Sequence, residues 1–150
     1  MIKETNNLQD FKVNIKVKLS ALWISVMFCY IYGDFFSLFV PGRIQNLING
    51  NSGAGQTTPI VLLLYAIVLS IPPLMIFLSL TLKPKVNRIV NIVTGLFFTV
   101  IMLLVVSNSI SRWMSFYIYL GVIEIILTTL ITKYAWFWPK HNLAQALTKN

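Results

Sequence analysis

Charged residues are scarce in this chain of 150 residues: they make up 11% of the sequence, and only 4 of them are Asp or Glu. A soluble domain carries about 25% charged residues. Hydrophobic residues instead reach 57%, and the mean hydropathy is +0.76. A water-soluble fold of this size has too little interior to hide so much apolar surface. The composition therefore excludes an ordinary soluble domain and predicts that lipid is the solvent.

Cysteine and histidine occur once each, as Cys29 and His141. A single cysteine allows neither a disulfide within the chain nor a thiolate metal site. The one histidine follows the last apolar run and has no neighbouring metal-ligating residue in the sequence. We therefore expect no metal and no cofactor.

Long apolar runs are abundant, and four of them have the roughly 20 residues that a bilayer crossing requires. They lie at about residues 19–40, 59–82, 89–106 and 113–137. The first run exceeds the apolar core of about 7–15 residues in a cleaved signal peptide, so we expect it to be retained. The sequence thus predicts an all-α integral membrane protein. Its four-span domain covers residues 19–138, between an interfacial arm (1–18) and a cytoplasmic tail (139–150).

The basic residues are distributed unevenly among the connections. All but two of the 12 lysines and arginines precede the first run, separate the second from the third, or lie at and beyond the end of the fourth. The exceptions are Arg43 and Arg112. Basic residues stay on the cytoplasmic side of a membrane. We therefore expect an antiparallel four-helix bundle with both termini cytoplasmic and the bilayer as its partner. The net charge of +8 is explained by this topology, so no nucleic acid partner is expected.

The connections differ in length. The longest, between the first two runs, contains RIQNLI, which we expect to form one or two helical turns in the interface. The other two, KPKVNR and SNSISR, are short and predict tight hairpins between successive spans.

Asp34 and Glu124 are the only acidic residues inside the apolar runs. A charged side chain at the bilayer centre costs about 2.5–3.5 kcal/mol, so both should face protein or water. At 1.5 Å per residue, Glu124 lies about 16 Å from the outer end of its span, near the middle of a core about 30 Å thick. Asp34 lies only about 9 Å from the outer end. Desolvation favours the neutral carboxyl at Glu124, which then needs an acceptor.

Helical spacing brings other polar side chains toward Glu124. Steps of three and four residues align one polar face on the first run and one on the fourth. The Pro72–Pro73 pair frees two backbone carbonyls near the same depth and predicts a kink in the second run. We expect a ligand to be bound in a layer centred on Glu124 and Tyr30, with Asp34 at its outer mouth. The residues assigned to ligand binding are Glu124, Tyr30, Asp34, Ser70, Trp23 and Tyr117.

Several stretches resemble a family of small four-span bacterial membrane proteins of unknown function. They are LSALWISVMFCYIYGDFFSLFVPG, IPPLMIFLSL, NRIVNIVTG and IEIILTTLITKYAWFW, and the resemblance covers about residues 18–138. It implies a four-span fold in the bacterial cytoplasmic (inner) membrane and no activity. Members of that family often carry a glutamate just before the Ile–Pro step, where this chain has Ser70. The resemblance therefore implies that a two-carboxylate site would lack one acid here.

Three functions are left open by these residues. In the first, the protein binds or transports a small cationic or amphipathic (lipidic) ligand, which exchanges for a proton on Glu124. In the second, it is a non-catalytic accessory or assembly subunit, and Glu124 only holds helices together. In the third, it is a membrane enzyme acting on a lipidic substrate with Glu124 or Asp34 as general acid. No second acid lies at a matching depth, so we assign no catalytic residue.

Two further points stay open at this stage. Asp34 has a structural alternative, an ion pair with Arg43 or Arg112 at the outer interface. A homodimer is a second alternative, because a chain of 150 residues forms only a thin wall around a pathway.

Overall fold

The computed structural model of the chain describes residues 11–52 and 55–139. The start of the predicted arm and nearly all of the predicted tail lie outside these described residues. The described elements are α1 (Ile15–Ser37), α2 (Arg43–Ile48), α3 (Pro59–Thr81), α4 (Pro84–Asn108), the 3-10 turn η1 (Arg112–Met114) and α5 (Ser115–Trp136). The described part of the chain is helical, with one isolated bridge between Asn51 and Gln56. The all-α prediction is confirmed, and 4 helices are long and apolar enough to cross a membrane.

Two helices begin earlier than the hydropathy predicted. α1 begins at Ile15 because the side chain of Asn14 caps it, accepting a hydrogen bond of 2.9 Å from Lys16 N. α4 begins at Pro84, since a proline fits the first helical turn, where no N–H partner is needed. The inner connection is therefore shorter than KPKVNR. Apolar runs mark only the lipid-matched part of a helix, and polar caps extend it.

The predicted short helix in the first connection is confirmed as α2. Gly42 precedes it with a φ of 75°, a left-handed conformation that glycine adopts without strain. At the other end of this connection, Thr58 caps α3 by accepting a hydrogen bond from Val61 N.

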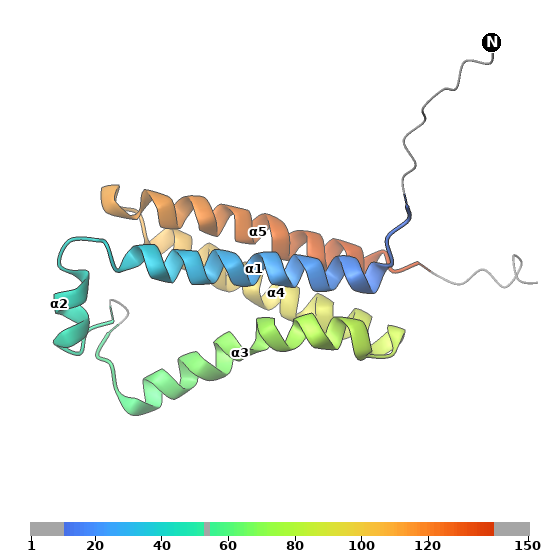
Figure 1. The fold of residues 1–150 in the computed structure, drawn as a ribbon, viewed down its shortest axis with the longest axis horizontal. Helices are drawn as coiled ribbons and strands as arrows, with labels where there is room; N and C mark the ends of the chain where they lie inside the picture. Colours follow the sequence, from blue (N-terminus) through green and yellow to red (C-terminus); the bar gives the residue numbers. More distant parts are fainter. Residues whose placement is uncertain (1–10, 53–54, 140–150) are drawn as a thin grey trace, which may run out of the picture.

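The long helices are packed unequally. α1, α4 and α5 lie side by side, whereas α3 bends and its first half diverges from them (Figure 1). The buried residues of α3 are Pro72, Met75 and Ser79, all in its second half. The prolines at 72 and 73 lie inside the helix and break its hydrogen-bond ladder, which accounts for the bend. The predicted tight hairpin between the second and third spans is thus limited to their junction, and α3 packs mainly on α1.

A compact apolar core fills the space where the second half of α3 meets the other helices. The indole of Trp23 contacts the ring of Phe98 edge to face, with 6.0 Å between centroids. The ring of Tyr30 also contacts Phe98, with 6.1 Å between centroids. The buried core consists of Leu19, Trp23, Val26, Met75, Phe98 and Ile131.

A buried polar network crosses this core. Asn91 Oδ1 accepts hydrogen bonds from Trp23 Nε1 at 2.8 Å and from Ser79 Oγ at 3.3 Å. Asn91 Nδ2 donates to Asn87 Oδ1 at 2.6 Å, and Asn87 Nδ2 donates to the carbonyl of Ser79 at 2.6 Å. All four side chains are 0% exposed. Because lipid cannot satisfy polar groups, this network ties α1, α3 and α4 together from within.

The C-terminal end of α3 is also held from outside the network. Lys16 Nζ donates to the carbonyls of Leu80 at 3.1 Å and Leu82 at 2.7 Å. These carbonyls lie at the helix end and have no helical N–H to pair with. The second half of α3 is therefore anchored at both its buried face and its end.

α4 and α5 approach closely at two glycines, Gly95 and Gly121. A Cβ added at Gly121 would lie 2.5 Å from Val106 Cγ2 and 3.3 Å from Met102 Cε. Small residues at such contacts let membrane helices approach and gain van der Waals packing. The α4–α5 interface is therefore sensitive to volume at these positions.

We expect Gly121→Ala to lower the free energy of unfolding by about 1–2 kcal/mol through overpacking against Val106. Adding Val106→Ala should restore most of the loss, because it removes the nearest methyl group. Gly33→Ala is the matched control, since its Cβ would lie 3.5 Å from Tyr117 Cε2, an ordinary contact. Reversible unfolding in mixed micelles measures all four proteins; an equal loss at Gly33 and Gly121 would contradict the packing explanation.

Candidate functional site

The side chain of Glu124 is buried in the middle of α5. The residue is 3% exposed, and its Oε2 has no hydrogen-bond partner among the described residues. The hydroxyl of Tyr30 on α1 is likewise buried without a partner and lies within electrostatic range of Glu124. A buried polar atom without a partner typically costs about 1–3 kcal/mol. The described part of the chain thus holds two buried hydrogen-bonding groups without partners, one on α1 and one on α5.

Hydroxyl groups fix the backbone beside Glu124. Thr128 Oγ1 donates to the carbonyl of Glu124 at 2.9 Å, and Thr99 Oγ1 lies 2.8 Å from Thr128 Oγ1. Thr128 is completely buried. These contacts link α4 to α5, so the carboxyl group of Glu124 projects from a rigid part of the helix.

A cavity of about 550 Å³ lies where α1 and α4 end, on the side away from Lys16 and Lys83. Asp34 is four residues after Tyr30 on α1, and Tyr117 is seven residues before Glu124 on α5, so each lies on the same helical face as its deeper partner. The cavity and the buried layer therefore form a polar line along α1 and α5. The lining residues are Asp34, Ser37, Arg43, Ser52, Val105, Asn108, Ser109, Ile110, Ser111, Met114 and Tyr117.

Arg43 enters this cavity from the first turn of α2. Its Nε is buried without a hydrogen-bond partner among the described residues. The guanidinium lies within electrostatic range of Asp34, yet no hydrogen bond joins these two described residues. Ser37 Oγ donates to the carbonyl of Asp34 at 2.7 Å, which leaves the carboxylate of Asp34 free of that hydroxyl. An ion pair of Asp34 with Arg43 was one alternative left open by the sequence; in the structure both side chains line one cavity without a hydrogen bond between them.

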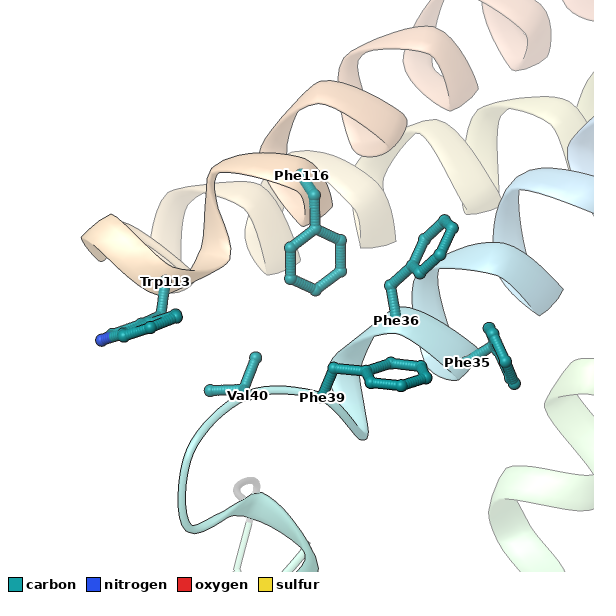
Figure 2. Close-up of a pocket in the computed structure, with 6 residues that line it drawn as sticks. All are labelled: Phe35, Phe36, Phe39, Val40, Trp113 and Phe116. Atoms are coloured by element: carbon teal, nitrogen blue, oxygen red, sulfur yellow. The ribbon is translucent and has the colours of Figure 1, made fainter.

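A second cavity of about 520 Å³ is lined by aromatic rings from α1, η1 and α5 (Figure 2). The rings of Phe36 and Phe116 meet edge to face at 6.1 Å. Its lining contains no acidic or basic side chain, so it suits an apolar group or, through the ring faces, a soft cation. Aromatic residues also gather at membrane interfaces without binding a specific ligand. The lining residues are Phe35, Phe36, Phe39, Val40, Trp113 and Phe116.

The structure does not place every predicted site residue beside Glu124. Ser70 is exposed, and its Oγ donates to the carbonyl of Ile67 at 2.7 Å, because the bend carries the first half of α3 away from the other helices. Trp23 is buried, but its Nε1 is engaged by Asn91 in the polar network. The expected place of Ser70 beside Glu124 is therefore corrected, whereas the assignment of Trp23 to ligand binding stays a prediction. Tyr30 lies within electrostatic range of Glu124, and Asp34 and Tyr117 line the same cavity.

Sequence reasoning missed two features of the site. Arg43 was considered only as an ion-pair partner, because nothing in the sequence shows that the short helix turns its side chain into a cavity. The Asn87–Asn91 pair carries a readable pattern, two asparagines four residues apart inside an apolar helix.

The described residues contain no group of three or more His, Cys, Asp or Glu side chains that could hold a metal ion.

Comparison with curated proteins and with solved structures gives no significant match. The model of a family of unknown function, DUF6326, matches residues 7–145. The matched range includes every described helix and both cavities. The family description assigns no ligand and no reaction. The chain therefore belongs to the family of unknown function DUF6326.

Proposed function

We propose that this chain is a multi-pass protein of the bacterial cytoplasmic membrane, an antiparallel four-helix bundle with both termini in the cytoplasm. The ammonium of Lys18 lies 5.7 Å from the ring centroid of Tyr134, which supports a common end for the start of α1 and the end of α5. The positive-inside rule assigns this end to the cytoplasm. The basic residues on the elements meeting there are Lys16, Lys18, Lys83, Lys85, Arg88 and Lys133.

Within this bundle, the protein binds or carries a small cationic or amphipathic ligand in the layer of Glu124 and Tyr30. One observation carries the proposal: Glu124 Oε2 and the Tyr30 hydroxyl are both buried without partners, inward from an outer cavity of about 550 Å³. Buried acids in membrane helices mark ligand or proton sites more often than packing. A cation would supply the charge that a proton on Glu124 otherwise supplies, so binding releases that proton.

The proposal is tested with tetraphenylphosphonium, a lipophilic cation, titrated calorimetrically into the purified protein in two buffers of different ionisation enthalpy. We expect binding to release protons, and Glu124→Gln to abolish that release and weaken binding about tenfold or more. The magnitude follows from the loss of one charge-assisted contact in a medium of low polarity.

Two control variants locate the cation. Phe116→Leu alters the aromatic cavity of Figure 2 and should leave binding unchanged. Glu124→Asp keeps the charge and should retain proton release. Two outcomes would contradict the proposed site. In the first, Glu124→Gln still binds the cation with unchanged proton release; in the second, only Phe116→Leu loses binding.

A non-catalytic assembly subunit is the second candidate function, and the exposed first half of α3 favours it. Large apolar side chains there, including Ile60, Leu63 and Ile67, are each more than half exposed, and this half of α3 diverges from the other long helices (Figure 1). Lipid or a second copy of the chain would cover this face. If Glu124→Gln changes neither ligand binding nor proton release, this candidate replaces the first.

A further inference from the structure

The outer cavity contains one acidic and one basic side chain that the protein does not pair with each other. Arg43 Nε is buried without a partner among the described residues, and the Ser37 hydroxyl donates to the carbonyl of Asp34 and not to its carboxylate. Both residues line the same cavity of about 550 Å³. A ligand that carries charges of both signs can contact both groups at once, whereas a ligand with charge of one sign can contact only one of them.

The cavity lies at the depth of lipid headgroups in the proposed membrane orientation. It is lined by Ser37 at the end of α1 and by Asn108 at the end of α4. α1 has 23 residues, which corresponds to about 34 Å of helix, so its outer end reaches the boundary of a core about 30 Å thick. Three further serines in the lining, Ser52, Ser109 and Ser111, give this end a polar rim.

The cavity is formed by α1, α2, α4, α5 and their connections, without any residue of α3. The first half of α3 diverges from the other helices at this end of the molecule (Figure 1). α3 therefore forms no wall between the cavity and a molecule in the outer leaflet. The lining also includes Val105 and Ile110, which provide apolar contact next to the charged groups.

We propose that this cavity binds a zwitterionic group made of a phosphate and a primary ammonium, as in phosphatidylethanolamine of the outer leaflet. The phosphate contacts the guanidinium of Arg43, which forms charge-assisted hydrogen bonds to such oxygens. The ammonium contacts the carboxylate of Asp34. The inference rests on the proposed membrane function and deepens it by naming the ligand class of the outer cavity.

Lipid binding by the full chain is measured by native mass spectrometry, with phosphatidylethanolamine, phosphatidylglycerol and soluble phosphoethanolamine as probes. We expect phosphatidylethanolamine to bind about tenfold more tightly than phosphatidylglycerol, because the latter leaves Asp34 unpaired. Arg43→Gln should weaken both lipids about tenfold, whereas Asp34→Asn should weaken only phosphatidylethanolamine.

The matched control is Arg112→Gln, which removes a positive charge at the same end without touching the cavity lining. If Arg43→Gln weakens binding no more than Arg112→Gln, or if Asp34→Asn weakens both lipids equally, the proposal is overturned. Soluble phosphoethanolamine that competes with the lipid at equal concentration would support the same chemistry with a soluble source. If soluble phosphoethanolamine does not compete, the headgroup bound in the cavity belongs to a membrane lipid.

The same preparation separates this inference from the proposed function. Glu124 does not line the outer cavity, so Glu124→Gln should keep phosphatidylethanolamine binding while it loses the response to tetraphenylphosphonium. Loss of the cation response in the wild type, with lipid selectivity retained, would remove the Glu124 site and leave the headgroup site. Loss of lipid selectivity, with the cation response retained, would remove the headgroup site and leave the Glu124 site. Melting temperatures of Arg43→Gln and Asp34→Asn check that the charge variants remain folded.

Discussion

Asn91→Ala is expected to lower the free energy of unfolding by about 3 kcal/mol. The substitution leaves three groups unpaired in a site with no exposure: Trp23 Nε1, Ser79 Oγ and Asn87 Oδ1. Hydrogen bonds between membrane helices average less than 1 kcal/mol each, but an unpaired buried group adds its desolvation cost. The loss should therefore exceed that of one bond.

Unfolding measured by steric trapping in bicelles checks this expectation. Asn108→Ala is the matched control at the end of the same helix, since its Nδ2 donates only to the carbonyl of Leu104 and the residue is exposed. Trp23→Phe should cost about 1 kcal/mol, because it removes one donor and keeps most of the packed ring. An effect at Asn91 no larger than at Asn108 would mean that the network does not hold the helices together.

Gly95→Leu is expected to destabilise the protein by about 3 kcal/mol or to prevent α4 and α5 from docking. A Cβ alone at Gly95 would lie 2.5 Å from Thr132 Oγ1 and 3.2 Å from the carbonyl oxygen of Thr128. The second contact is with backbone, which cannot rotate away. The larger leucine would push apart helices whose hydroxyl contacts also position Glu124.

Phe97→Leu is the control for Gly95→Leu, because Phe97 is 45% exposed and lies two residues away on the same helix. Thiol–thiol cross-linking between cysteines placed at the α4–α5 interface reports docking in membranes, with Cys29 replaced by serine to remove the native thiol. The double variant Gly95→Ala/Thr132→Ala should be more stable than Gly95→Ala alone, because it lacks Thr132 Oγ1, the atom closest to the added Cβ. Unchanged cross-linking in Gly95→Leu would show that the interface tolerates the added volume.

The sequence by itself determined the helical class and much of the arrangement along each helix. Length and hydropathy predicted four helices long enough to cross a membrane, and the RIQNLI segment predicted α2. Depth along each helix was also predicted, because the helical rise is constant: Tyr30 and Glu124 were expected at one level. Axial position needs only the order of residues, which the sequence contains.

Tertiary structure decided which side chains meet across helices. Pro72–Pro73 predicted a kink, yet only packing shows that the bend carries Ser70 outward, away from Glu124. Periodicity placed Trp23 on a polar face, yet its partner is Asn91 on another helix. Lipid tails are as apolar as leucine side chains, so hydropathy does not distinguish a lipid-facing side from a buried one. The choice is made instead by local close packing, as at Gly95 and Gly121, and by hydrogen bonds between helices distant in sequence, which no single run of residues encodes.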